Sequence, residues 1–234
     1  MPDAPWIMTQ TWNDLLFAHW PVDRQLLQER LPAGLPVDVF DGQAWLGIVP
    51  FHITNLAPRG VPSIPFVSAF AELNVRTYVT LEGKPGVYFF SLDAASALAV
   101  AGARTLFHLP YFTASMTVNV SGDTVQYSSS RDTTVASARF EGRYRPIGAV
   151  EPPVPGTLEH FLTERYCLYT IDGSRRVRRL QIHHPPWPLQ RADAEIRVNT
   201  MADAAGVRLP TTKPLLHFSK RQDMVGWGLE IVDS

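Results

Sequence analysis

Polar and apolar side chains alternate strictly along residues Glu72–Val79. Successive side chains of a β-strand point to opposite faces, so a carboxylate, an amide, a guanidinium and a phenol share one face here: Glu72, Asn74, Arg76 and Tyr78. Leucine, valine and threonine occupy the other face. The polar row suits either a solvated sheet surface or the wall of a binding cavity, and we expect the cavity.

Glu72 and Arg76 carry groups that could act on a small molecule in such a cavity. Four residues of strand separate their Cα atoms by roughly 13 Å, so the two groups do not satisfy each other directly. A buried carboxylate needs a partner, which another strand, water or a ligand must supply. We expect Arg76, or Arg59 from a nearby loop, to hold an anionic group. Asn74 would hydrogen-bond the ligand, and Glu72 would orient it or act as a general acid or base.

Residues outside this strand are further candidates for ligand contacts. Arg104 and His108 lie four apart on a predicted helix, on a face that meets either the cavity mouth or solvent. Tyr166 follows Glu164 and Arg165, and this group places charge either in the pocket or at a helix end. Trp187 is held rigidly between prolines, where it either walls the cavity or plugs the end of a barrel.

The histidines show no pattern typical of a metal site. His183 and His184 are adjacent, so on a strand they face opposite ways, and the spacing of the others carries no ligand signature. We therefore expect no metal and no cofactor. A serine hydrolase also lacks support, because His217 and Ser219 share a strand face but no strand–turn–helix nucleophile motif is present.

The local pattern predicts a mainly β chain with a few helices (α+β). Strands are expected over 11–20, 37–40, 44–53, 69–81, 87–92, 111–120, 124–130, 134–144, 165–171, 177–183, 192–199, 215–220 and 225–232. Helices are expected over 23–30, over 94–109 with Asp93 as the N-cap, over 157–164, and as a turn over 200–205. The proline-rich residues 57–65 predict a loop long enough to close over a pocket.

Length and composition favour a single domain over residues 1–234, with a loose lead-in over 1–10 and a core over about 11–232. Hydrophobic residues make up 45% and charged ones 18%, which argues against disorder. A net charge of −1 argues against nucleic acid as a partner, and a solvated hairpin edge explains the basic run over 175–179.

The sequence shows no secretory signal and no apolar run near the ~20 residues of a membrane span, so we expect a cytoplasmic protein without a membrane partner. The single cysteine, Cys167, rules out an intrachain disulfide. Whether the chain forms a homo-oligomer is left open.

Five segments resemble a known family, in matching order along the chain. They are Glu72-Leu-Asn-Val-Arg-Thr-Tyr-Val, Val87-Tyr-Phe-Phe-Ser-Leu-Asp-Ala, Phe161-Leu-Thr-Glu-Arg-Tyr, His184-Pro-Pro-Trp-Pro-Leu and His217-Phe-Ser-Lys-Arg. From about Thr11 to Val232 the chain is similar to the YqjF-like family, domain of unknown function 2071. The resemblance implies a fold like acetoacetate decarboxylase, a twisted antiparallel β-barrel or cone with a central cavity. The family has no established activity.

Acetoacetate decarboxylase works through a Schiff base on a lysine, whose amine is kept deprotonated by a second lysine and a dry pocket. Glu72 resembles the glutamate of that enzyme, and Arg59 or Arg76 could stand for its arginine. The lysine has no counterpart, because the chain contains only Lys84, Lys213 and Lys220, and none lies in 90–115. The resemblance therefore does not imply decarboxylation.

Three functions follow from these residues. We favour a protein that binds a small polar or anionic metabolite in a β-barrel cavity. The alternative is an enzyme without a Schiff-base lysine, such as a lyase, hydratase or hydrolase, with Glu72 as general acid or base. In the third, side chains fill the barrel and nothing binds.

Overall fold

The computed structural model describes residues 2–63, 68–133 and 136–232. Its strands are β1 (Met8–Val22), β2 (Ala44–Pro58), β3 (Phe70–Leu81), β4 (Lys84–Ala94), β5 (Tyr111–Thr113), β6 (Ser115–Ser121), β7 (Thr124–Arg131), β8 (Ala138–Ile147), β9 (Cys167–Ile171), β10 (Val177–His183), β11 (Leu189–Asn199) and β12 (Leu215–Ile231). Its helices are α1 (Arg24–Arg30), α2 (Ala97–Phe107), α3 (Leu158–Thr163) and α4 (Met201–Ala204). The mainly β architecture predicted from the sequence is confirmed.

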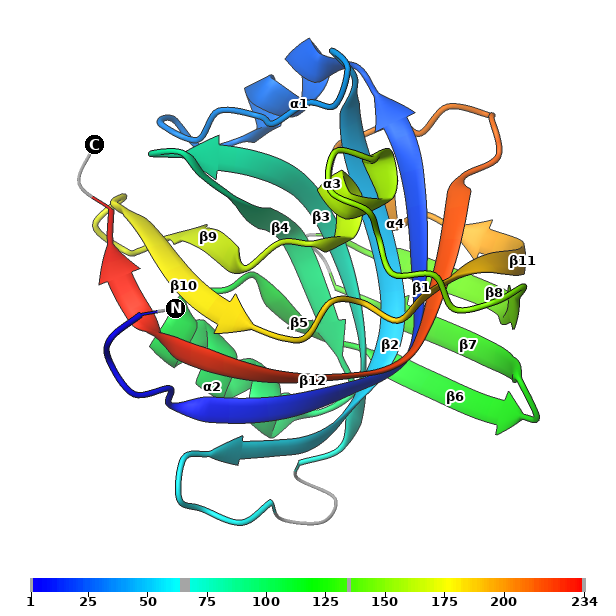
Figure 1. Cartoon of the computed structure of the whole chain (residues 1–234), viewed down its shortest axis with the longest axis horizontal. Coiled ribbons are helices and arrows are strands. Elements are labelled where there is room, and N and C mark those ends of the chain that lie inside the picture. The colour runs from blue at the N-terminus through cyan, green and yellow to red at the C-terminus, as the bar shows by residue number, and fades with distance from the viewer. Residues whose placement is uncertain (1, 64–67, 134–135, 233–234) are drawn as a thin grey trace.

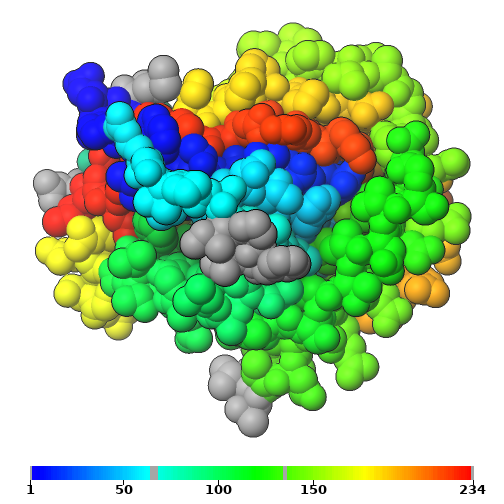
Figure 2. Space-filling view, turned by 90° about the horizontal axis from the view of Figure 1, so that it is seen from below, coloured from blue at the N-terminus to red at the C-terminus, as the bar shows by residue number. Residues whose placement is uncertain are grey.

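The strands close into a ring because β1 pairs with both β2 and β12. In the described part of the chain the closed order is β1-β2-β3-β4-β9-β10-β12 (Figure 1). Figure 2 shows β1, β2 and β12 side by side along one face of the molecule, in blue, cyan and red. A ring of this kind encloses an interior that side chains must fill or leave hollow.

Strand β12 also belongs to a second row of strands. Its residues 225–231 pair with β10, whereas His217–Ser219 pair with β11, which continues the sheet through β8 and β7 to β6. The sequence predicted two strands over 215–220 and 225–232. They are one strand, because β1 pairs with it on both sides of the intervening residues.

The second row of strands packs against one face of β3. Leu73, Val75 and Val79 lie in a cluster of buried apolar side chains with Tyr127 of β7 and Phe140 of β8. The Tyr127 hydroxyl lies 2.7 Å from the carbonyl oxygen of Glu72. This face of β3 is therefore filled, and the polar row lies on the other face.

The predicted N-cap at Asp93 is wrong. Strand β4 continues through Ala94, because Asp93 pairs with β3 and β5, and its carboxylate binds Arg131. Helix α2 begins later, with Ser96 as its N-cap, whose side chain accepts a hydrogen bond from the amide of Ala99. The predicted helix over 23–30 is confirmed as α1, and the structure shows Asp23 as its N-cap.

Two predicted segments fall partly outside the described residues. The strand expected over 134–144 is β8, which begins at Ala138, and residues 134 and 135 are not described. The loop expected over 57–65 starts later, because β2 runs to Pro58, and residues 64 and 65 are not described. No helix in the described ranges is long and apolar enough to cross a membrane.

Candidate ligand-binding cavity

A cavity of about 270 Å³ lies inside the ring, on the polar side of β3. Its walls come from β1 to β4, α2, β10 and the residues around Thr163 and Trp187. Most lining side chains are apolar, and the polar ones include Glu72, Asn74, Arg76, Tyr111, Arg165 and His184. A hollow of about nine water volumes contradicts the filled-barrel alternative, taking ~30 Å³ for each water.

Because β3 is regularly pleated, the polar side chains of its alternating row face this cavity. Glu72, Asn74 and Arg76 all line it, as the alternation predicts. Across the sheet they lie opposite Phe51, Val49 and Gly47 of β2. The two apolar neighbours line the cavity as well, so the polar groups stand in an apolar wall.

A β-bulge in β4 widens this wall. Val75 pairs with Ser91 and Arg76 with Phe89, so β4 carries one extra residue between them. Phe89 and Leu92 are three apart and would face opposite ways on a regular strand, yet both line the cavity. The bulge therefore turns two large apolar side chains toward the same space.

Glu72 is a buried carboxyl group with one close partner. The Tyr111 hydroxyl donates a hydrogen bond of 2.8 Å to Glu72 Oε2. Burial and, to a smaller extent, the nearby Asp93 carboxylate raise the pKa of Glu72 to about 8, against the lowering effect of this hydrogen bond. At neutral pH Glu72 is therefore mostly protonated and able to donate a proton.

Asn74 is buried with an unused acceptor. Its side chain is 5% exposed, and within the described ranges Oδ1 has no hydrogen-bond partner. Its neighbours on both adjacent strands are apolar, Val49 and Leu92. A buried polar atom left unpaired costs about 1–3 kcal/mol. Water or a ligand in the cavity would supply the missing donor.

Arg76 lies at the end of the cavity nearest α3. Its Nη2 donates to the Leu162 carbonyl oxygen at 3.1 Å, and its guanidinium lies over the rings of Phe17 and Tyr78. Its Nε has no hydrogen-bond partner, and no carboxylate of the described residues forms an ion pair with it. The positive charge is thus held by a carbonyl and two aromatic faces, without an acid.

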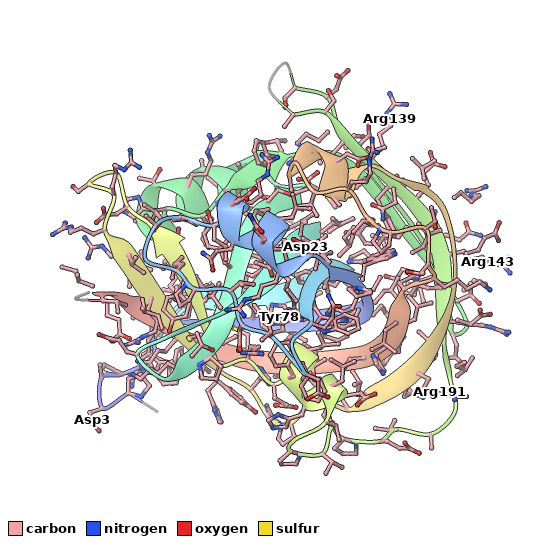
Figure 3. All side chains as sticks on the ribbon, turned by 90° about the horizontal axis from the view of Figure 1, so that it is seen from above. Asp3, Asp23, Tyr78, Arg139, Arg143 and Arg191 are labelled. Atoms are coloured by element: carbon pink, nitrogen blue, oxygen red, sulfur yellow. The ribbon has the colours of Figure 1, made fainter. Side chains whose placement is uncertain are left out.

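Gly47 leaves room for this arginine. A Cβ atom at Gly47 would lie 3.0 Å from His19 Cδ2 and 3.4 Å from Arg76 Cγ. His19 in turn lies 2.6 Å from the Tyr78 hydroxyl. Tyr78 is enclosed near the middle of the molecule, as Figure 3 shows, and Arg76 lies over its ring.

Arg165 also lines the cavity but is already paired. Its Nη1 lies 2.7 Å from Asp38 Oδ2, and its Nε donates to the Phe161 carbonyl oxygen. Its charge is therefore balanced within the protein. Arg76 is the guanidinium that a ligand anion could neutralise.

Trp187 joins the three β3 residues in the cavity wall. Its indole Nε1 donates to the Thr163 carbonyl oxygen at 2.8 Å, and its ring stacks on Trp12. Glu164 Oε1 accepts a hydrogen bond from the Trp187 amide. The cavity wall is thus rigid at this point, as the flanking prolines predict.

The other predicted contact residues lie away from the cavity. Arg59 lies over the ring of Trp6, and Arg104 is exposed on α2. His108 follows α2 in a left-handed conformation with φ 52°, so it leaves the helical face that it was expected to share with Arg104. Tyr166 is 38% exposed, donates its hydroxyl to Glu164 and stacks on His184.

Tyr111 and His184 line the cavity, although the sequence predicted neither of them as a ligand contact. Tyr111 meets Glu72 only because the three residues of β5 pair in parallel with β4. His184 is buried, which lowers its pKa, and its Nδ1 lies 3.0 Å from Gln222 Nε2. No spacing within the chain predicts either position, since Tyr111 depends on the pairing of β5 with β4 and His184 on its contact with Gln222 of β12.

No lysine lines the cavity. Lys84, Lys213 and Lys220 are exposed, and Lys220 forms an ion pair of 2.6 Å with Asp14. Across the described ranges, no group of three or more His, Cys, Asp or Glu side chains is arranged to hold a metal ion. The site therefore lacks the amine that a Schiff base requires.

The basic side chains elsewhere are dispersed or paired. Arg178 and Arg179 bind Asp172 and Glu230. Figure 3 shows Arg143 and Arg191 pointing outward from the outer strands. Arg145, beside them on β8, faces Asp193 on β11.

Comparison with known proteins gives a family and a fold. The family model described as "uncharacterized conserved protein", DUF2071, matches residues 9–223. The uncharacterized protein YqjF of Bacillus subtilis (strain 168) is 52% identical over 229 residues, which cover 98% of this chain and 94% of YqjF.

Among solved structures, an acetoacetate decarboxylase-like enzyme from Sphingomonas wittichii RW1 superposes with a TM-score of 0.69 at 12% identity, covering 98% of this chain and 94% of that one. The enduracididine biosynthesis enzyme MppR, complexed with pyruvate, gives 0.67 at 12% identity, with coverage of 98% and 91%. Acetoacetate decarboxylase from Legionella pneumophila gives 0.63 at 15% identity, with coverage of 100% and 92%. At these identities the likeness is one of fold.

Proposed function

The chain belongs to the DUF2071 family of uncharacterized conserved proteins with an acetoacetate decarboxylase-like fold, and we propose that it binds a small organic anion in the cavity beside β3. The observation that carries this proposal is Arg76, a guanidinium in an apolar wall with no carboxylate partner among the described residues. A bound carboxylate would supply that partner through charge-assisted hydrogen bonds.

Two other polar residues of the β3 wall support the same ligand chemistry. Asn74 Oδ1 has no hydrogen-bond donor among the described residues, and a ligand hydroxyl or a bridging water would supply one. Glu72, protonated at neutral pH, would donate to a ligand oxygen and would not repel an anion as an ionised carboxylate would. The structural neighbour MppR is itself complexed with pyruvate, a small carboxylate.

The test is retention of a ligand by the purified chain. Mass spectrometry of the native protein, followed by thermal-shift titration of the retained compound, should identify an organic anion that raises the melting temperature. Arg76→Gln should weaken its binding by about 10- to 100-fold, because a hydrogen bond to a charged group contributes about 1.5–3 kcal/mol. Arg104→Gln, which removes an exposed arginine of α2, is the matched control and should bind normally. Equal binding by Arg76→Gln would refute the proposal.

Catalysis is the second candidate, and the raised pKa of Glu72 favours it. A carboxyl group with a pKa of about 8 is a competent general acid at neutral pH. The reaction would be that of a lyase, a hydratase or a hydrolase, and Glu72 would exchange a proton with the bound anion. Glu72→Gln keeps the shape and the hydrogen-bond donor of the protonated acid. It should bind the ligand while slowing turnover by about 100-fold or more. If the ligand is recovered chemically unchanged after incubation with the wild-type chain, catalysis is refuted and binding is the remaining function.

A cytoplasmic location also belongs to this proposal, since a small metabolic anion is available there. Fractionation of cells that produce the tagged chain tests it.

A further inference from the structure

The cavity has a charged end and an apolar end. Arg76 and Arg165 lie near α3, whereas α2 contributes Ala99, Gly102 and Ala103 to the opposite part of the lining. In Figure 1, α3 lies in the upper half of the molecule and α2 at the lower left, with strands between them. A molecule that occupies the whole space therefore meets charge at one end, and at the other it meets small apolar residues beside the Glu72–Tyr111 hydrogen bond.

The α2 end owes its space to small side chains. A Cβ atom built at Gly102 would meet no atom within 4 Å, so the volume beside it is open. Leu106, one turn further along α2, lines the cavity and is 67% exposed, which places the opening beside this helix. Small residues alone do not define a site. The independent sign of a ligand is Asn74, which is buried, lines the same cavity and has no partner for Oδ1 among the described residues; a water held between Oδ1 and a carboxylate on Arg76 would donate to both.

The charges restrict the ligand to one anionic group. Arg165 is neutralised by Asp38, so Arg76 offers a single unpaired positive charge. A dicarboxylate or a phosphate dianion would bring a second negative charge without a partner into an apolar cavity, which is costly. A carboxylate also matches the planar fork of a guanidinium.

The volume restricts the size of the ligand. The cavity holds about 270 Å³. At ~30 Å³ for each water-sized group, this space accepts about nine non-hydrogen atoms, or a carboxylate with a body of about six carbons. The lining around that body is aliphatic and aromatic, including Val87, Phe89 and Leu92.

We propose that the ligand is a monocarboxylate with an apolar body, that its carboxylate lies on Arg76, and that Gly102 sets the length of body that the cavity accepts. This inference rests on the proposed function and adds the ligand class and the residue that selects it. Each methylene that fits should raise the affinity about threefold to fourfold, until the body reaches α2.

The experiment is isothermal titration with unbranched saturated carboxylates from acetate to dodecanoate. The wild-type chain should bind best at an intermediate length of about seven carbons in total. The dicarboxylate of the same length should bind at least about tenfold more weakly. Gly102→Leu should move the optimum to shorter acids by about two to three carbons, leave acetate and propionate unchanged, and weaken the wild-type optimum by about tenfold.

Gly173→Leu is the matched control. Gly173 lies in the turn between β9 and β10, has open space where a Cβ would lie, and is not part of the cavity lining. The affinities of Gly173→Leu across the series of carboxylates should equal those of the wild-type chain. Gly102→Ala, the smallest change, tests the same position if Gly102→Leu does not fold, and it should shift the optimum by about one carbon.

The outcomes separate this inference from the proposed function. If Arg76→Gln loses every acid but Gly102→Leu keeps the wild-type length profile, anion binding stands and the role of α2 is refuted. If no carboxylate binds, or if Arg76→Gln binds them all normally, the proposed function fails as well. A tighter dicarboxylate would overturn the assignment to monocarboxylates.

Discussion

Asp93 with Arg131, and Glu72 with Arg76, show two arrangements of a buried acid and an arginine around the same strands. Asp93 on β4 binds Arg131 on β7 at 2.7 Å, and both side chains are almost fully buried. Glu72 and Arg76 lie four residues apart on β3 and point along one wall without meeting. The first pair joins β4 and β7, two strands that are not neighbours in the sheet. The second pair stands side by side in one strand.

The difference separates stability from binding. The direct pair joins the two charges through Asp93 Oδ1 and Arg131 Nη1, although Asp93 Oδ2 and Arg131 Nε have no hydrogen-bond partner among the described residues. Separation along one strand leaves Glu72 to Tyr111, and Arg76 to a carbonyl and aromatic rings. Unpaired polar groups destabilise a fold slightly, and functional sites commonly accept this cost. On this comparison, changes to the first pair should affect folding, and changes to the second should affect the ligand.

Breaking the Asp93–Arg131 pair should have the largest effect. Asp93→Ala leaves a buried guanidinium without its carboxylate, which should lower the free energy of unfolding by about 3–5 kcal/mol. Urea denaturation followed by circular dichroism measures this change. The double variant Asp93→Ala/Arg131→Met removes both charges and should be more stable than the single one. If Asp93→Ala lowers the free energy of unfolding by less than about 1 kcal/mol, the pair contributes little to stability.

The proton on Glu72 should have an intermediate effect. Burial raises its pKa to about 8, whereas glutamate in an unfolded chain has a pKa of about 4.3. The native state thus keeps a proton that the unfolded chain has lost, so stability falls as the pH rises through this interval.

The clearest window lies between about pH 7 and 8, where a fall of about 1 kcal/mol is expected. The buried histidines have lowered pKa values and are largely neutral in both states there, and Asp93, with a pKa of about 6, has already ionised. Stability curves of the wild-type chain and of Glu72→Gln measure it. The decline should be absent in Glu72→Gln, and its persistence there would assign it to another group.

Arg76→Gln should change stability little, in contrast to Arg131→Gln. No carboxylate loses its partner, and the lost hydrogen bond to the Leu162 carbonyl is worth about 1 kcal/mol. Paired urea titrations of Arg76→Gln and Arg131→Gln give the comparison directly. Equal destabilisation by the two variants would mean that Arg76 is a structural residue like Arg131.

Arg104→Ala should have the smallest effect. The side chain is exposed on α2 and lies outside the cavity lining, so stability should change by about 0.5 kcal/mol or less. Ligand binding should be unchanged in a thermal-shift titration. A loss of binding would show that Arg104 contacts the ligand and that the mouth of the cavity lies on the exposed face of α2.

Family and fold were predictable from sequence segments, and both are confirmed by the family match and the structural neighbours. The inward position of Glu72, Asn74 and Arg76 was predictable as well, because the pleat of a strand fixes which side chains share a face. The role of Asp93 was not. A short polar residue before an alanine-rich stretch is typical of an N-cap, and only the partner on β7 reveals the ion pair.

The sequence by itself determined the alternation of β3, the absence of a lysine from residues 90–115 and the family, since each depends on residue types at fixed spacing. Only the tertiary structure decided which face of β3 is hollow, that Tyr111 meets Glu72, and that Arg76 rather than Arg165 lacks an acid. These features depend on pairings between residues far apart in the chain, from Asp38 with Arg165 to Asp93 with Arg131. No local spacing encodes such contacts, because strand order and packing bring them together.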